Sequence, residues 1–265
     1  MDQFESFKAT QKQVWAHFLP FEVHTTPCAA VLVKRAGVRA GQSVLDVACG
    51  TGVVSVTAAR LGARVTSLDL TPELLERARE NARIAGVDIN WNEGDVENLP
   101  FADTSFDVVL SQFGHIFAPR PEVAIREMLR VLKPGGTIAF STWPPDLFVG
   151  RMVELSVKYM PPPTQAVPPM PMWGDPNIVR QRLGAAVKDI HFDHERMTVP
   201  ALSPSHHRTS VEKSSGSIVR MVAMLQESDP AKLEQFRREY DALAAEYFGD
   251  NLLRQDYLVT RATKI

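Results

Sequence analysis

The chain has 265 residues, of which 45% are hydrophobic, so it can bury a full core in one elaborated domain or in one domain with a lid. Its 29 basic and 31 acidic side chains leave a formal charge of −2, which disfavours both nucleic acid and an anionic membrane as partners. We therefore expect the partner to be a small molecule.

Cysteine usage and the N-terminal segment indicate the setting in which the protein works. Cys28 and Cys49 are too few for a disulfide scaffold or for a zinc site of four thiolates, so a reducing, cytoplasmic setting is the simplest interpretation. The charged N-terminal segment does not resemble a signal peptide, and no run approaches the ~20 apolar residues of a membrane-spanning helix. We expect no membrane insertion, and the sequence does not indicate the oligomeric state.

Residues 1–40 are expected to form a helical N-terminal segment, which we call the prelude. An amphipathic pattern extends to about Leu19. In the helix expected next, Thr26 is the predicted N-cap, Pro27 fits the first turn and Gly37 ends the helix.

Short apolar runs alternate with helical patterns from residue 43 to residue 143. This order predicts a parallel sheet with helical crossovers, that is, a Rossmann-like, doubly wound core over residues 41–143. The sequence LKPGG is expected to separate the last of these strands from the helix before it. The strands are predicted at 43–48, 64–70, 89–94, 106–113 and 136–143, and the helices near 52–61, 72–85 and 121–132.

The pattern changes after Trp143. Residues 144–174 are rich in proline and methionine, and we interpret them as a lid over a pocket, although a proline-rich surface connection without a ligand also fits this composition. The side chains expected to form a pocket for an apolar or aromatic molecule are Phe148, Met152, Tyr159, Met170, Met172 and Trp173.

The C-terminal part is expected to complete the same domain. Alternating runs at 187–199 and 256–265 predict two more strands, and helices are expected near 205–226 and 230–248. The start of the first of these helices is left open, because the segment HHRTSVEKSSGS is polar enough to be a loop. The predicted fold class is therefore α/β, a doubly wound, mostly parallel sheet of seven strands with one antiparallel strand, preceded by the prelude. Residues 144–265 supply the lid, the last strands and a helical cap.

The turn VACGTG after the first predicted strand is the strongest functional motif. In a doubly wound sheet, ligands bind beyond the carboxyl ends of the strands. Gly50 and Gly52 allow a ligand to approach the backbone closely, and the helix that follows presents free N–H groups. Asp69, at the end of the second strand, can accept hydrogen bonds from both hydroxyls of a ribose. These features fit a nicotinamide cofactor as well as any other adenosyl ligand.

Three further residues distinguish between these ligands. Ser55 stands where a G-x-G-x-x-G motif would have its third glycine. Asp46, on the first strand, would repel a pyrophosphate but not a cation, although it could also serve only to order the turn. Asp95, after the third strand, can accept a hydrogen bond from the exocyclic amine of adenine. The ligand indicated has a ribose, an adenine and a positive centre, and S-adenosyl-L-methionine meets this description.

Four segments within residues 43–142 together resemble a known family. VLDVACGTG, SLDLTPELL, GDVENLPF and LRVLKPGG are similar to the motifs of the class I S-adenosylmethionine-dependent methyltransferases, in particular the ubiquinone/menaquinone-type group (methyltransferase type 11). The resemblance implies methyl transfer by in-line displacement to a small acceptor, with S-adenosyl-L-homocysteine as the product. Neither the acceptor nor the methylated atom (O, N, C or S) is indicated. The alternatives are a nicotinamide-dependent oxidoreductase and a non-catalytic protein that binds an adenosyl cofactor.

The resemblance also implies a set of cofactor-binding residues. Asp69 would bind the ribose, and Asp46 would contact the amino group of the cofactor indirectly. The residues that would surround the methionine part are Ala48, Gly50 and Gly52, and Gln112 would line the sulfonium side. Leu70 would pack on the adenine, and Asp95 and Val96 would hold its edge. Residues adjacent to these complete the set, namely Thr51, Gly94 and Phe113.

His115 is the candidate general base. It follows the fourth predicted strand, where related enzymes present residues to both the sulfonium and the acceptor, and the ordinary pKa of histidine near 6.5 suits proton transfer at neutral pH. The alternative is that His115 packs beside the cofactor and transfers no proton. A base would be needed for an alcohol or a protonated amine, and hardly at all for an acidic phenol.

The other histidines are expected to contribute less. No metal site is predicted, because His191 and His194 stand three residues apart in a predicted strand and so face opposite sides. The pair His206 and His207 is expected to be solvated or to belong to the lid. Residues of the prelude that could reach the site are Trp15, His17 and His24.

Overall fold

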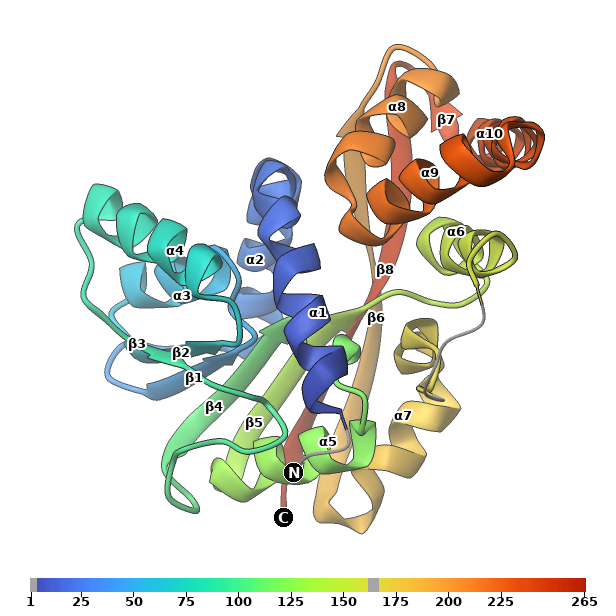
Figure 1. The fold of residues 1–265 in the computed structure, drawn as a ribbon. Coiled ribbons are helices and arrows are strands. Elements are labelled where there is room, and N and C mark those ends of the chain that lie inside the picture. The colour runs from blue at the N-terminus through green and yellow to red at the C-terminus, as the bar shows by residue number, and fades with distance from the viewer. Residues whose placement is uncertain (1–3, 162–166) are drawn as a thin grey trace.

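The structure is a computed structural model that describes residues 4–161 and 167–265. Within these residues the chain forms an eight-stranded sheet in the order β3-β2-β1-β4-β5-β8-β6, with β7 paired to β8 (Figure 1). β1 to β5 pair in parallel, and β8 lies antiparallel between β5 and β6. The strands are β1 Ser43–Val47, β2 Arg64–Asp69, β3 Ile89–Glu93, β4 Phe106–Gln112, β5 Leu132–Thr142, β6 Val187–Pro200, β7 Phe248–Gly249 and β8 Leu252–Lys264.

The mostly parallel sheet with one antiparallel strand is confirmed. The short strand β7 is added to it, and β5 and β8 begin earlier than predicted, at Leu132 and Leu252. β7 has two residues, too few to produce a pattern of alternation. β5 begins at Leu132 rather than at residue 136, because Leu132 already pairs with Phe106 before the register shifts and the ladder resumes at Thr137. The irregular stretch contains Pro134, which has no N–H to donate. LKPGG is therefore an irregularity within β5 and not a separator before it.

Helices cover both faces of this sheet. The chain passes from β1 to β2 and β3 in one direction along the sheet, and from β4 to β5 in the other. Because crossovers between parallel strands are right-handed, the two sets of helices are expected on opposite faces. Accordingly α3 contacts α2 and α4, whereas α5 contacts α7. The strands at the centre are covered on both faces, and Leu45 and Val109 are fully buried. These helices are α2 Glu22–Ala36, α3 Val53–Arg60, α4 Pro72–Ala85, α5 Pro121–Val131 and α7 Pro176–Leu183.

The prelude consists of α1 (Glu5–Trp15), a 3₁₀ segment η1 (Ala16–Phe21) and α2. The predicted start of the second helix at Thr26 is wrong, since α2 begins at Glu22 and contains Pro27 in its interior. Glu22 forms an ion pair of 2.9 Å with Arg77 of α4, which favours the earlier start. Thr26 donates its hydroxyl to the Glu22 carbonyl at 2.7 Å and does not cap the helix. The predicted end at Gly37 is confirmed.

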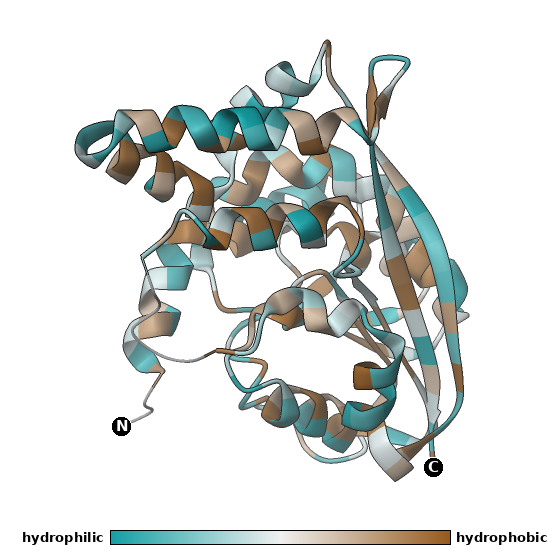
Figure 2. Cartoon of the chain, turned by 90° about the vertical axis from the view of Figure 1, so that its right-hand side faces the viewer, coloured by the Kyte–Doolittle hydropathy of each residue, from teal (hydrophilic) through white to brown (hydrophobic). Residues whose placement is uncertain are grey.

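The C-terminal cap gathers around the upper ends of the long strands β6 and β8 in Figure 1. Figure 2 shows hydrophilic and hydrophobic residues following one another along these two strands, as expected when one face of a strand lies against the core. No helix of the described residues combines the length and apolarity needed to cross a membrane. The cap helices are α6 Phe148–Val157, α8 Pro204–Ser214, α9 Gly216–Ser228 and α10 Pro230–Ala245.

The helix predicted near 205–226 is two helices, α8 and α9. The chain is extended at Ser215, between them. Gly216 then lies directly against α1, where a Cβ atom added to this glycine would come within 2.5 Å of the Val14 carbonyl oxygen. The break thus lets the cap approach the prelude closely, a long-range contact that helical periodicity does not report.

Candidate active site

A cavity of about 460 Å³ lies where the prelude and the cap meet the carboxyl ends of β1, β2 and β4. Its lining includes the glycine turn and the ends of these strands, the aromatic residues of the prelude, and side chains from the cap. Of the twelve residues predicted to bind the cofactor, eleven line this cavity, and Gly52 is the exception. The eleven are Asp46, Ala48, Gly50, Thr51, Asp69, Leu70, Gly94, Asp95, Val96, Gln112 and Phe113.

Asp69 ties the glycine turn to the end of β2. One carboxylate oxygen accepts a hydrogen bond from the Gly50 N–H at 2.7 Å, and the other accepts one from the Thr71 N–H at 2.9 Å. Burial raises the pKa of Asp69, and these backbone hydrogen bonds oppose the shift. Each carboxylate oxygen can accept a further hydrogen bond, so Asp69 can bind hydroxyl groups of a ligand while it holds the turn.

The two glycines of the turn have different roles. Both have positive φ, +54° at Gly50 and +77° at Gly52. A Cβ atom on Gly50 would meet nothing within 4 Å, because Gly50 faces the cavity, whereas one on Gly52 would lie 2.8 Å from the Trp91 ring and 3.1 Å from Ala78. Gly52 is therefore needed to pack the turn against the protein, and its predicted contact with the cofactor stays a prediction.

Alanine substitutions should separate these two roles. We expect Gly52→Ala to destabilise the protein by ~2–4 kcal/mol, through left-handed strain and overlap with Trp91. Gly50→Ala should cost only ~1 kcal/mol of stability, from strain alone, but should weaken cofactor binding more than Gly52→Ala does. Urea unfolding and calorimetric titration with S-adenosyl-L-homocysteine measure both effects, and equal destabilisation by the two substitutions would contradict this assignment.

Asp46 is a buried carboxylate with one oxygen free. Its Oδ2 accepts a hydrogen bond from Ser55 at 2.5 Å, and Ser55 in turn accepts one from Ser67 at 2.8 Å. Its Oδ1 is buried without a hydrogen-bond partner. Burial, and to a lesser extent the charge of Asp69, raise the pKa of Asp46 to about 7. An orphaned acceptor beside a second carboxylate fits a cationic ligand, and so agrees with the ligand that the sequence indicates.

The loop after β3 is held against α1. Lys8 forms ion pairs of 2.6 Å with both Asp95 and Glu97, and Lys12 forms one of 2.9 Å with Glu93. The other carboxylate oxygen of Asp95 accepts a hydrogen bond from the Glu97 N–H at 2.9 Å. These ion pairs bring α1 over the end of the cavity where Gly94, Asp95 and Val96 lie.

The end of β4 has an unusual backbone that shapes the cavity. Phe113 has φ +59° and Ala48, at the end of β1, has φ +53°, conformations that are costly for residues other than glycine and that concentrate at functional sites. The Phe113 ring stacks on Trp143 at a centroid distance of 4.1 Å. Gln112 donates its side-chain N–H to the Thr25 carbonyl at 2.9 Å, which ties β4 to the prelude.

Aromatic residues of the prelude form a wall of the cavity that the sequence analysis largely missed. Trp15 lines the cavity as predicted, and its ring lies 5.6 Å from that of Phe117. Phe18 and Phe21, 5.4 Å apart, extend this wall. His17 and His24 are not among the described residues that line the cavity. The repeated aromatic residues in WAHFLPF are the signal that could have identified the wall.

The predicted lid contributes methionines to the cavity and aromatic residues to the core. Residues 162–166 lie outside the described residues, and the rest of the segment contains α6 and the 3₁₀ turn η3 (Met170–Gly174). Met152 and Met170 line the cavity as predicted, with Met160 beside them, whereas Met172 is not among the lining residues. The aromatic residues predicted to line it pack instead within the protein, Phe148 against Tyr240, Tyr159 against Phe236 and Trp173 against Phe140.

His115 is buried away from the cavity. Its ring lies between Phe140 and Trp173, at centroid distances of 4.8 and 4.6 Å, and neither ring nitrogen has a hydrogen-bond partner. Burial, reinforced by the charge of Arg182, lowers the pKa of His115 to about 3. A neutral histidine that does not line the cavity is poorly placed to accept a proton from an acceptor bound there. This geometry favours the alternative, that His115 has a packing role.

We expect His115→Leu to retain methyl transfer within about threefold of wild type, because general-base catalysis would be worth ~10²-fold or more. The substitution should also preserve or raise stability, since it removes two unpaired polar atoms from the core. The gain should grow as the pH falls below 6.5, where the unfolded wild-type histidine binds a proton that the folded form excludes. Thermal unfolding at pH 5 and pH 7.5, with an activity assay, checks this, and a hundredfold loss of turnover without unfolding would restore the role of base.

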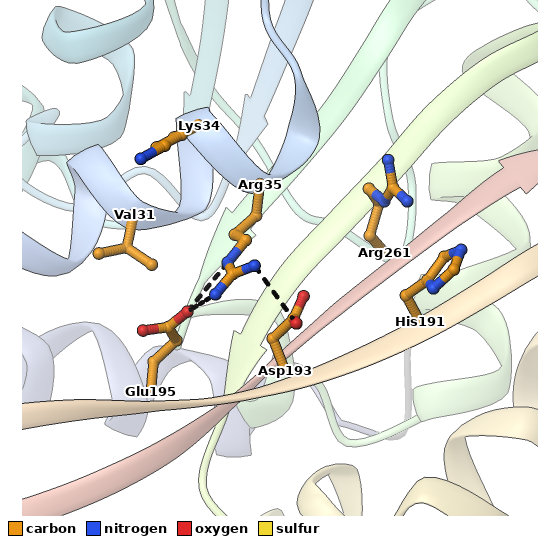
Figure 3. Close-up of a pocket in the computed structure, with 7 residues that line it drawn as sticks. All are labelled: Val31, Lys34, Arg35, His191, Asp193, Glu195 and Arg261. Atoms are coloured by element: carbon orange, nitrogen blue, oxygen red, sulfur yellow. Dashed lines mark hydrogen bonds and ion pairs between the residues drawn. The ribbon is translucent and has the colours of Figure 1, made fainter.

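A second hollow of about 580 Å³ lies between α2 and the outer strand β6. Figure 3 shows Arg35 of α2 pointing toward Glu195 and Asp193 of β6. The ion pairs measure 2.5 Å to Glu195 and 3.3 Å to Asp193. His191, on the same strand, lines this hollow, and the described residues contain no group of three or more possible ligands that could hold a metal ion. The ion pairs connect the prelude to the sheet, so we assign this hollow a structural role.

Some known proteins are similar to the chain over nearly its whole length, and others over less than half of it. The family model described as "Methyltransferase domain" matches residues 45–140. Over nearly its whole length the chain is 34% identical to "Uncharacterized protein Rv1405c" of Mycobacterium tuberculosis, with 98% of this chain and 96% of that protein covered. "Demethylmenaquinone methyltransferase" of Clavibacter sepedonicus is 42% identical over 127 residues, which cover 46% of this chain and 51% of that protein.

A solved structure supports the fold. The YcgJ protein from Bacillus subtilis superposes on the chain with a TM-score of 0.61, covering 89% of this chain and 97% of that one. Its sequence identity is 19%, so the likeness shows a shared fold and nothing more specific.

Proposed function

Because the chain belongs to the family of S-adenosylmethionine-dependent methyltransferases, we propose that it transfers a methyl group from S-adenosyl-L-methionine to a small apolar or aromatic acceptor. The observation that supports this best is one continuous cavity with two unlike ends. The end beside β1 and β2 has two buried carboxylates and an open glycine turn. The end beside the cap has methionine, aromatic and aliphatic side chains.

In this proposal Asp69 binds the ribose hydroxyls and Asp46 attracts the positively charged amino end of the cofactor. Oδ1 of Asp46 has no hydrogen-bond partner and can therefore interact with the amino end. The open space over Gly50 leaves room for the cofactor beside Asp69. Leu70 packs on the adenine, and Asp95 accepts a hydrogen bond from its amine. The remaining cofactor contacts are assigned to Ala48, Thr51, Gly94, Val96, Gln112 and Phe113.

Asp95 also connects the adenine end of the cavity to α1. Because Lys8 lies 2.6 Å from this carboxylate, α1 closes over the adenine end when the ion pair is formed. We infer that the prelude must shift for the cofactor to enter and leave.

The cofactor supplies a methyl carbon that is already activated by the adjoining sulfonium. The protein therefore has mainly to align the acceptor and to exclude water. The wall of Trp15, Phe18, Phe21 and Phe117 on one side and the cap on the other enclose the space in which the acceptor would lie.

Calorimetric titration tests the cofactor assignment. We expect S-adenosyl-L-homocysteine to bind with micromolar affinity, and NADH, which would identify a nicotinamide enzyme, to show no binding at the same concentrations. An acceptor library is then incubated with S-adenosyl-L-methionine and the purified chain, with detection of S-adenosyl-L-homocysteine by mass spectrometry. Cofactor binding without turnover on any acceptor would favour the non-catalytic alternative, and preferential binding of NADH would contradict the proposal.

A further inference from the structure

The cap end of the cavity contains a buried polar pair that the proposed cofactor site does not use. His207 of α8 is 3% exposed and Gln255 of β8 is 7% exposed, and both line the cavity. His207 is predicted from the sequence to be solvated or to belong to the lid, and its burial excludes the first of these. Its ring is held between Phe148 and Tyr240, at centroid distances of 5.8 and 6.1 Å, so its orientation is fixed by packing.

The hydrogen bonds of this pair define which ring nitrogen can accept. The side-chain nitrogen of Gln255 lies 3.3 Å from Nε2 of His207, and an amide nitrogen can only donate, so Nε2 is the acceptor. The proton is then on Nδ1, which donates to the Tyr240 hydroxyl at 3.0 Å. The hydroxyl donates to the sulfur of Met152 at 3.7 Å. Burial lowers the pKa of His207 to about 4, with the charges of His24 and His206 adding to the effect, so the ring stays neutral at neutral pH.

Among the residues that the structure describes, charged side chains line the cavity only at its cofactor end. They are Lys8, Glu22, Asp46, Asp69 and Asp95. The lining residues contributed by the cap, β6 and β8 carry no full charge. Because an ionised group without a partner is costly to bury, the part of a ligand that enters the cap end must be neutral.

The serines of the cap offer fewer hydrogen bonds to a buried ligand. Ser156 donates its hydroxyl to the Met152 carbonyl within α6. Ser217 is exposed and Ser215 half-buried, which puts them at the rim of the cavity. His207 and Gln255 therefore provide the hydrogen-bonding groups in the buried part, and their 3.3 Å contact is long enough to be replaced by better-placed partners.

We propose that His207 and Gln255 are acceptor-binding residues, and that they select an uncharged aromatic acceptor carrying a hydroxyl group. The hydroxyl donates to Nε2 of His207 and accepts a hydrogen bond from the Gln255 amide. The aromatic ring lies against Trp143, which stacks on Phe113, and against Met197, which pairs with Gln255 across β6 and β8. This assignment rests on the proposed function, since it places the acceptor in the same cavity as the cofactor.

Three naphthalene probes test this selection on protein saturated with S-adenosyl-L-homocysteine. We expect 2-naphthol to bind about five- to tenfold more tightly than 2-methylnaphthalene, which has the same shape without the hydroxyl, as one or two neutral hydrogen bonds allow. The charged 2-naphthoate should bind more weakly than 2-naphthol. Addition of 2-naphthol should also shift the ¹⁵N resonance of Nε2 in His207 and leave that of the exposed His206 unchanged.

Two substitutions check the residues themselves. Gln255→Met and His207→Phe keep the bulk of each side chain, and in either variant the preference for 2-naphthol over 2-methylnaphthalene should fall below about twofold, as the hydrogen bond is lost. Affinity for S-adenosyl-L-homocysteine should not change, and His206→Gln should keep the wild-type preference. Equal binding of the two probes by wild type, or a preference retained in both variants, would overturn the assignment. Failure of wild type to bind S-adenosyl-L-homocysteine would instead contradict the proposed function.

Discussion

Replacing Asp69 with alanine should weaken the binding of S-adenosyl-L-homocysteine by about 100-fold or more. Hydrogen bonds to a charged group contribute ~1.5–3 kcal/mol each, and the ribose is proposed to form two of them. The substitution also removes the acceptor of the Gly50 and Thr71 N–H groups, so the turn that carries the cofactor loses its anchor. Calorimetric titration of the purified variant measures the loss.

Asp88→Ala is the matched control for this experiment. Asp88 precedes β3 and is exposed, so its removal should leave affinity within about twofold of wild type, as for surface substitutions in general. Circular dichroism and thermal unfolding establish that the Asp69 variant is folded at the temperature of the titration. Affinity within threefold of wild type in a folded Asp69→Ala protein would contradict the ribose-binding role.

The parts of the fold that follow from local patterns could be predicted from the sequence. The alternation of β1 to β5 with α3, α4 and α5 is visible because most of these strands are short apolar runs and because helices such as α4 carry start and stop signals, here Pro72 and Gly86. The glycine turn, Asp46 and Asp69 could be placed for the same reason. They stand at the ends of strands, and the carboxyl ends of parallel strands share one edge of the sheet.

His115 shows where such reasoning fails. Its position after β4 was predicted, but not the side to which it points. The positive φ of Phe113 turns the chain, so that Phe113 lines the cavity and His115 lies against Phe140 and Trp173. Phenylalanine does not signal this conformation, since bulky residues seldom adopt it.

The cap side of the cavity depends on contacts between segments far apart in the chain. His207 meets Tyr240 and Gln255, which are 33 and 48 positions away, and this cluster forms only when α8, α10 and β8 are packed together. The spacing of residues within one segment does not indicate such a long-range contact. The break between α8 and α9 at Ser215 was missed for the same reason, because it depends on the approach of α1.

The affinity for S-adenosyl-L-homocysteine should increase with pH through the titration of Asp46. Its pKa of about 7 in the free protein means that below pH 7 the carboxyl group carries a proton, which must be lost before it can attract the cationic amino end of the ligand. We expect the dissociation constant to rise by up to tenfold per unit as the pH falls from 7 to 5.5, and to level off above pH 8. Titrations over this range in buffers of matched ionic strength measure the profile.

Asp46→Asn should flatten this profile, since the amide does not titrate, and should bind at pH 8 with an affinity close to that of wild type at pH 5.5. A slope unchanged in this variant would assign the pH dependence to another group, such as Asp69, whose pKa is also raised by burial.

As the pH rises, the contribution of Asp46 to the stability of the ligand-free protein should fall, whereas the affinity for S-adenosyl-L-homocysteine should increase. A carboxyl group whose pKa is higher in the folded than in the unfolded protein stabilises the fold when protonated, and this contribution is lost as the pH rises toward 7. The ligand-free Asn variant should therefore be more stable than wild type at pH 8, while binding the ligand less well. Such a result would mean that the buried charge of Asp46 costs stability and is kept for its attraction to the cofactor.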